Sequence, residues 1–322
     1  MVSRKARKRA TIRLIIVLIF LTTLSISFAI CTVIKYLAYR EQETIEEVRP
    51  ENLDDIEPTE PEPVLLSVDF QPVVDAWVKS VSGKKGLVIY DLDLNKVVGE
   101  YNVDQKFSTA SLYKLFVVYE GYRLVQNGEW DGNGLAGKTG KTILKCLDLA
   151  IRESNSACAE TLWGMMGRDK LNEIAQTDFG IKDVVVSSLT ATPKEIMQMM
   201  QVFYKHDEIV DENLITTMQD SFLNQPITTY NWRQGLPSGF SEAVKVYNKV
   251  GWNYDPDRKI WTIYDDTAIV KFAGTEDLAE RNFIIVVMTS GINFTQIRRL
   301  GTEIEAAFNA AREAALVSAE EL

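Results

Sequence analysis

Ser111 and Lys114 are the two side chains in this sequence best suited to covalent chemistry. They lie three residues apart in segment 107–114, where polar residues give way to a helical apolar run, so on a helix they share a face. At a helix start, free backbone N–H groups and the positive end of the dipole favour an oxyanion, and a neighbouring amine can take the hydroxyl proton. The chain has one histidine, His206, in a polar connector. A serine–lysine pair is therefore favoured over a Ser-His-Asp triad.

Two further segments strengthen this prediction, because the S-x-x-K pattern alone is weak. A second copy, at residues 82–85, lies in a turn before an expected strand. A Ser-Asn-Ser sequence at 154–156 lies between two helical stretches, and a Lys-Val-Gly-Trp sequence at 249–252 ends an expected strand. The three segments give S-x-x-K, then S-x-[N/S], then K-x-G on a strand.

This order of motifs resembles the penicillin-recognising serine hydrolases, closest to class A β-lactamases and their DD-peptidase-like relatives. The resemblance covers roughly residues 64–316 and implies four catalytic roles. Ser111 resembles the acylated nucleophile and Lys114 its base. Ser154 resembles the serine that relays a proton to the leaving nitrogen, and Lys249 the strand lysine that tunes it and attracts a substrate carboxylate. Residues implied to contact the substrate are Ser156, Val250, Gly251 and Trp252, where the N–H groups of Ser111 and Trp252 would form the oxyanion hole.

The alternative for each of these residues is a structural role. Ser111 and Ser154 are also suited to capping the helices that they precede. Lys249 would serve equally as a solvated charge on a strand edge.

The sequence also departs from the family at three places. Ser156 stands where the family usually has Asn, so we expect the amide that holds substrate and lysine to be lost. Val250 stands where the family has Thr or Ser, which removes a hydroxyl for the substrate carboxylate. Class A β-lactamases activate the deacylating water with a Glu on a long loop. The corresponding connection, 181–192, is short and holds Asp183 as its one acid, so we expect slow hydrolysis of a penicilloyl adduct.

These residues predict a serine hydrolase that works through an ester on Ser111. The expected substrate is a D-Ala-D-Ala-type peptide of the cell wall, and the expected ligands include β-lactams. A β-lactamase with a different deacylation route is one alternative. A non-catalytic peptidoglycan-binding or regulatory module on the same fold is another, which the residues at 156 and 250 suggest.

The first 63 residues of the sequence predict a membrane anchor and a stalk. Residues 1–13 hold six basic residues and no acid, and 14–34 are 21 residues without a charge, long enough to span a bilayer. The basic cluster predicts a cytoplasmic N-terminus and an extracytoplasmic domain. Residues 35–63 are rich in acids and Pro and predict an extended spacer. The hydrolase domain is expected at 64–316, followed by a tail at 317–322.

The alternative to an anchor is a cleavable signal peptide. The small-x-small sequence at 27–29 resembles a cleavage site, but the apolar run continues past it, which favours an uncleaved single-pass anchor.

Composition excludes several other classes of protein. A formal net charge of −10 argues against a nucleic-acid partner. Apart from Cys31 in the expected span, the cysteines are Cys146 and Cys158, with no C-x-x-C and no nearby His, so neither a metal nor another cofactor is expected. Whether the two pair is left open. Residues 132–139 fit a P-loop expression but follow a helical segment instead of a strand, so no nucleotide is expected.

The elements that must position these residues predict an α/β (α+β) fold. Helical spacing at 69–81 is followed by expected strands at 86–91 and 96–101. A long helical stretch at 141–225 follows the Ser111 helix, and then strand patterns return. The later strands are expected at 243–250, 260–272 and 283–290, before a closing helix at 293–316. The first pair must join the last three in a five-stranded, mostly antiparallel sheet, with terminal helices on one face and an all-helical lobe on the other.

Overall fold

The computed structural model describes residues 63–182, 184–226 and 230–320. The predicted cytoplasmic tail and membrane anchor lie outside these residues, as does the stalk except for its last residue. Among the helices that are described, none combines the length and the apolar character needed to cross a membrane.

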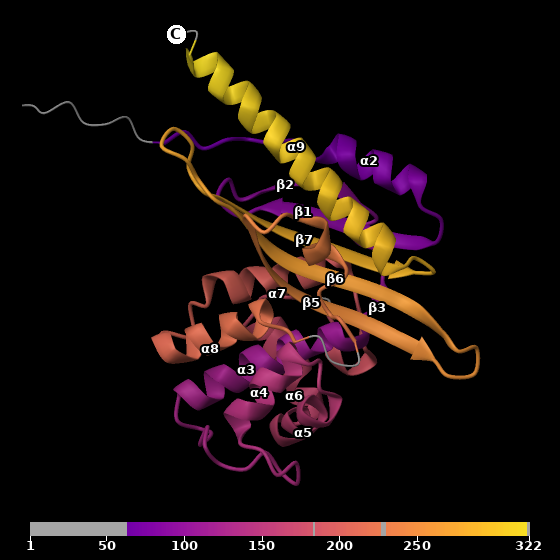
Figure 1. Cartoon of the computed structure of the whole chain (residues 1–322). Helices are drawn as coiled ribbons and strands as arrows, with labels where there is room; N and C mark the ends of the chain where they lie inside the picture. Colours follow the sequence, from indigo (N-terminus) through magenta and orange to yellow (C-terminus); the bar gives the residue numbers. More distant parts are fainter. Residues whose placement is uncertain (1–62, 183, 227–229, 321–322) are drawn as a thin grey trace, which may run out of the picture. The chain divides into compact units, whose positions relative to one another are not determined.

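Five strands form one antiparallel sheet in the order β2-β1-β7-β6-β5. They are β1 (Lys84–Asp91), β2 (Lys96–Tyr101), β5 (Val244–Asp255), β6 (Ile260–Phe272) and β7 (Arg281–Ser290). The N-terminal hairpin joins the three C-terminal strands through β1 and β7, which pair along their length. This confirms the predicted sheet, and it leaves β5 at one edge, facing the helices below it (Figure 1).

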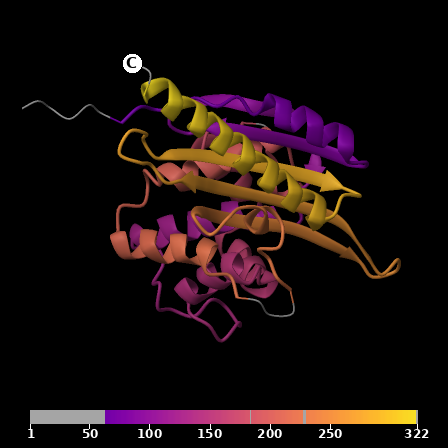
Figure 2. The same cartoon turned by 45° about the horizontal axis from the view of Figure 1, so that its top comes forward.

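Two terminal helices, α2 (Gln71–Ser80) and α9 (Phe294–Glu320), cover one face of the sheet (Figures 1 and 2). Trp77 of α2 is fully buried, and its indole N–H donates to the Gln296 carbonyl 2.8 Å away. Phe308 of α9 stacks on Phe272 of β6 with ring centroids 3.9 Å apart. The apolar face predicted for each terminal segment therefore packs on the sheet.

The other face carries the helical lobe. Its helices are α3 (Lys114–Gln126), α4 (Ile143–Arg152), α5 (Ser156–Met166), α6 (Arg168–Thr177), α7 (Pro193–Lys205) and α8 (Glu212–Leu223). Helix α3 is buried on almost every side, which is typical of the central helix of a domain. Gly167, at φ +90°, separates α5 from α6, and a capping box between Thr192 and Glu195 begins α7. The stretch predicted as helical is thus five helices.

Three details differ from the sequence-based expectations. Helix α9 continues to Glu320, so residues 317–320 of the predicted tail are helical. A two-stranded ribbon pairs β3 (Phe107–Ser108) with β4 (Thr190–Ala191), and such short strands leave no alternating pattern in a sequence. Strand β5 extends five residues beyond the predicted end at 250. Its last residues belong to a long hairpin with β6, whose aromatic side chains pack on one another: Trp252 lies 5.4 Å from Tyr264, between ring centroids.

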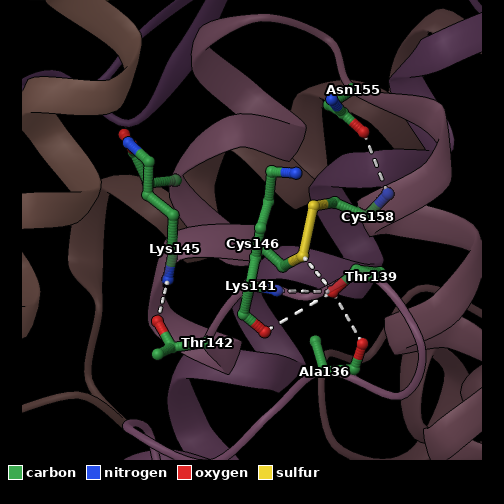
Figure 3. The surroundings of a disulfide bond; sticks show 9 residues. Ala136, Thr139, Lys141, Thr142, Lys145, Cys146, Asn155 and Cys158 are labelled. Carbon is green, nitrogen blue, oxygen red and sulfur yellow. Dashed lines mark hydrogen bonds and ion pairs between the residues drawn. A yellow bond between two sulfur atoms is a disulfide. The ribbon is translucent and has the colours of Figure 1, made fainter.

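Cys146 and Cys158 form a disulfide that joins α4 to α5 (Figure 3). The Asn155 side chain begins α5 by accepting a hydrogen bond from the Cys158 backbone N–H at 3.0 Å. The disulfide answers the question that the sequence left open. Because it ties together the two helices that flank residues 153–155, it also restrains the loop that carries Ser154.

Candidate active site

Ser111 lies in a four-residue 3-10 turn, Ala110–Tyr113, that leads directly into α3. Residues three apart in such a turn are eclipsed, which places Ser111 and Lys114 on one side, as predicted. Neither the turn nor α3 has a side-chain cap, so helix capping does not explain Ser111. Its side chain is partly exposed, and in the described part of the chain its hydroxyl makes no hydrogen bond to Lys114 or Ser154.

Lys114 is fully buried and points towards the loop between α4 and α5. Its Nζ donates to the Ser154 carbonyl at 2.5 Å and lies 3.3 Å from the Ser154 hydroxyl. The Ser156 hydroxyl lies 3.1 Å away. The longer family amide is absent at this position, but the shorter serine still reaches the amine.

Ser154 lies between the two predicted catalytic lysines. Its hydroxyl is 2.9 Å from Lys249 Nζ on β5 as well as 3.3 Å from Lys114 Nζ. Its backbone has φ +53°, an uncommon conformation for a residue with a side chain and one that clusters at functional sites. Asn155, and not Ser154, provides the side-chain cap of α5. A capping role therefore does not explain Ser154.

Lys249 is 1% exposed, so it is not a solvated strand-edge charge. Its Nζ donates to the Val250 carbonyl at 2.7 Å in addition to its contact with Ser154. The Val250 side chain is 1% exposed, and what Val250 provides to the site is this backbone acceptor. The structure thus brings together four predicted residues from three separate segments: Ser111, Lys114, Ser154 and Lys249.

Gly251 allows β5 to pack closely against the Ser111 turn. A Cβ atom on Gly251 would lie 2.6 Å from the Thr109 carbonyl oxygen and 2.8 Å from Leu112 Cγ. Both contacts are closer than folded proteins tolerate, so the strand approaches the turn only with glycine here. Trp252, the next residue, is 9% exposed, and its indole N–H has no hydrogen-bond partner among the residues that the structure describes. Because Gly251 contacts the Ser111 turn, the backbone of Trp252 lies next to that contact.

Burial controls the charge state of both lysines. Loss of hydration lowers the pKa of Lys114 to about 8, and the Glu160 carboxylate partly opposes that effect. Burial also lowers the pKa of Lys249 well below its ordinary value, and the positive charge of Lys114 lowers it further, against the attraction of Asp266. A buried lysine with a lowered pKa is suited to act as a base near neutral pH.

The connection that lacks a Glu packs directly behind the Ser111 turn. The Leu189 carbonyl accepts a hydrogen bond from the Thr109 N–H at 2.8 Å, and the β3–β4 ribbon pairs Ser108 with Thr190. This confirms a short packed connection at its described residues. Asp183, its one acid, lies outside them.

Sequence reasoning missed two acids that act on these lysines. Asp266 is fully buried in β6, opposite Val250, and burial raises its pKa to about 7. Glu160 accepts a hydrogen bond from the Tyr113 hydroxyl at 2.7 Å. Its negative charge raises the pKa of Lys114 and so opposes part of the effect of burial. The pair Asp265-Asp266 inside a strand with several apolar residues was a usable signal, because buried acids cluster at functional sites. Glu160 lies on a helix of polar and apolar residues, so the sequence offered no such signal for it.

Within residues 63–182, 184–226 and 230–320, no group of three or more His, Cys, Asp and Glu side chains is arranged to hold a metal ion. His206 lies at the end of α7, where its ring Nδ1 is 3.3 Å from the Ile209 carbonyl.

The chain was compared with protein-family models, with curated protein sequences and with solved structures. A family model described as "Beta-lactamase enzyme family" matches residues 69–311. No curated protein sequence matches the chain.

Among solved structures, similar ones are class A and other bacterial β-lactamases. An ancestral class A β-lactamase is 14% identical with a TM-score of 0.61, over 74% of this chain and 100% of the other. A β-lactamase from Burkholderia vietnamiensis is 14% identical with a TM-score of 0.61, over 73% and 94%. A halotolerant bacterial β-lactamase is 18% identical with a TM-score of 0.58, over 74% and 98%. The chain therefore has the class A β-lactamase fold.

Proposed function

The chain belongs to the beta-lactamase enzyme family, and we propose that it is a serine hydrolase that forms an acyl-enzyme on Ser111. The observation that carries this proposal is the position of the Ser154 hydroxyl, 2.9 Å from Lys249 Nζ and 3.3 Å from Lys114 Nζ, next to the Ser111 turn. A hydroxyl between two buried amines is arranged to pass protons.

The geometry supports a two-stage acyl transfer. In the first stage, the Ser111 oxygen attacks the substrate carbonyl carbon, and the neutral amine of Lys114 takes the hydroxyl proton. Ser154 then gives its own proton to the leaving nitrogen as the carbon–nitrogen bond breaks, and Lys114 restores that proton to Ser154. In the second stage, water attacks the ester, and Ser111 recovers its proton. The backbone N–H groups of Ser111 and Trp252 would hold the oxyanion, and each such donor contributes about 3 kcal/mol of barrier lowering.

The proposed natural substrate is a D-Ala-D-Ala-type cell-wall peptide, and β-lactams are proposed ligands. The similar solved structures are β-lactamases. Strand β5 forms an edge of the sheet, and an extended peptide can add to such an edge through backbone hydrogen bonds. Lys249 near this edge supplies a positive charge for a substrate carboxylate.

Release of a β-lactam adduct is proposed to be slow. The 181–192 connection contains no Glu, and its described residues pack against the Ser111 turn instead of enclosing a deacylating water with a carboxylate. Hydrolysis of β-lactams with turnover is the second candidate function, favoured by the identity of the similar structures.

We further propose that the domain lies outside the cytoplasm on a membrane-anchored stalk. The support is the uncharged segment 14–34 with basic residues before it. The Cys146–Cys158 disulfide adds support, because disulfides persist in oxidising compartments.

Intact-mass measurement of the purified protein during exposure to penicillin tests acylation and deacylation together. We expect one penicilloyl adduct on the wild type, none on Ser111→Ala, and an unchanged adduct on Ser82→Ala. Ser82 is the matched control because it begins the second S-x-x-K copy.

The time course decides between the candidates. A long-lived adduct supports the slow-release enzyme, whereas rapid loss of the adduct with continued consumption of penicillin identifies a β-lactamase. No adduct on the wild type would refute the acylation proposal and favour a non-catalytic module, which peptidoglycan binding that survives Ser111→Ala would then establish.

A further inference from the structure

A cavity of about 410 Å³ lies between helices α7 and α8 and strands β5 and β6. Its size falls within the range of small-molecule sites. The residues that line it include none of the proposed catalytic residues. It is therefore a separate feature of the helical lobe, whose helices α7 and α8 lie on the face of the sheet opposite α2 and α9 (Figure 1).

The interior of the cavity is apolar and adaptable. Met200 and Met218 are 0% and 2% exposed, and Phe203, Phe222 and Ile269 are also buried. Methionine side chains are flexible and polarizable, and they adjust to ligands of irregular shape. This interior suits the hydrocarbon part of a small molecule.

A positive charge lies in the wall of the cavity. The Lys271 ammonium is 5.6 Å from the ring centroid of Tyr204 and 5.7 Å from that of Tyr247. Across the β5–β6 pair, Lys271 is directly opposite Lys245. Like charges in this position are unfavourable, and a bound anion would relieve that repulsion. In the described part of the chain, neither lysine makes an ion pair with a carboxylate.

Two acids, Asp93 and Glu280, lie near this wall, and neither forms an ion pair with Lys271 among the described residues. Asp93 accepts hydrogen bonds from Arg281 Nε at 3.1 Å and from the Asn282 N–H at 2.7 Å. Glu280 is exposed and forms no ion pair with Lys271 among the described residues. The cavity therefore combines an apolar interior with a cation that forms no ion pair among the described residues, although the Glu280 carboxylate acts on both flanking tyrosines.

We propose that this cavity binds a small amphipathic carboxylate. The apolar part of the ligand would occupy the space between Met200, Met218 and Phe222. Its carboxylate would pair with the Lys271 ammonium, with the Tyr204 and Tyr247 rings on either side. This binding site is independent of the chemistry proposed for Ser111.

Calorimetric titration of the full-length protein with phenylbutyrate tests the proposal. We expect saturable binding that weakens by at least about tenfold in Lys271→Met, because a charge-assisted hydrogen bond is lost. Phenylbutanol, which has the same apolar part and no charge, should bind the wild type at least about tenfold more weakly. Lys79→Met is the matched control, because Lys79 is exposed on α2, over the other face of the sheet, and it should bind as the wild type does.

A second variant keeps the test valid if Lys271→Met does not fold. Gln219 is exposed and lines the cavity, so Gln219→Trp should fill the space without disturbing the core and should abolish binding. Absence of saturable binding to the wild type would overturn the proposal. So would equal affinity for phenylbutyrate and phenylbutanol, or unchanged affinity in Gln219→Trp.

Discussion

Replacement of Lys114 by Met should change how the stability of the protein depends on pH. Burial lowers the pKa of Lys114 from 10.5 to about 8. Between these two pH values, the unfolded chain holds a proton on Lys114 that the folded protein has released, so the free energy of unfolding of the wild type rises with pH. The pKa difference corresponds to about 3 kcal/mol across this window. Below pH 8 the whole penalty is present, because the folded protein must then bury a charged amine.

Urea denaturation of the wild type and Lys114→Met at several pH values measures this effect. The hydrogen bonds lost to Ser154 and Ser156 change the stability of the variant by an amount that varies little with pH. Loss of the Lys114 charge weakens the lowering of the Lys249 pKa in the variant, but burial, the larger cause, still lowers it in both proteins. The free-energy difference between wild type and variant should therefore shift by about 3 kcal/mol towards the wild type as the pH rises from 8 to 10.5. Lys79→Met should run parallel to the wild type. Parallel curves for Lys114→Met would refute the inference that the folded protein holds this amine neutral.

The same pKa predicts the pH dependence of acylation. The neutral amine is the base, so the rate of adduct formation should fall about tenfold for each pH unit below 8, to about a hundredfold below its plateau at pH 6. Time-resolved intact-mass measurement with penicillin gives this rate directly. A rate that stays constant over that range would exclude Lys114 as the base.

Three further variants test other parts of the site and of the fold around it. Gly251→Ala places a Cβ 2.6 Å from the Thr109 carbonyl oxygen and should lower the free energy of unfolding by about 1–3 kcal/mol; an unchanged urea midpoint would contradict the close packing. Ser154→Ala should slow adduct formation by about a hundredfold or more, and a rate within about twofold of the wild type would exclude it from proton transfer. The double variant Cys146→Ser and Cys158→Ser should lose about 3 kcal/mol of stability in urea denaturation under oxidising conditions, whereas equal stability would show that the disulfide does not restrain the fold.

Periodicity in the sequence was sufficient to predict the sheet, because β7 is continuously apolar over residues 283–288 and β1 over 87–90, and a turn between β1 and β2 marks the hairpin. The β3–β4 ribbon was not predictable in this way. Each of its strands has two residues, so its existence depends on how the 181–192 connection packs, and not on a local pattern.

The residues of the candidate site were brought together by the sequence for a different reason. Ser111 and Lys114 are near in sequence, but Ser154 and Lys249 reach them only through tertiary packing, and the sequence related them through the resemblance of ordered motifs. That route identifies residues that a family uses. It does not find Asp266, which acts on Lys249 from the neighbouring strand, because this contact depends on the register between β5 and β6.

The two departures from the family motifs have separate consequences in this structure. The Ser156 hydroxyl still contacts Lys114 at 3.1 Å, and Val250 still offers its carbonyl to Lys249. The groups that hold the two amines are therefore present, and what both positions lack is a polar group directed at a substrate. We infer that the substitutions alter substrate recognition more than proton transfer. Restoring Ser156→Asn or Val250→Thr should therefore change the concentration of penicillin needed for half-maximal acylation while the limiting rate stays within a few-fold. A large change in the limiting rate alone would show that these positions serve the chemistry itself.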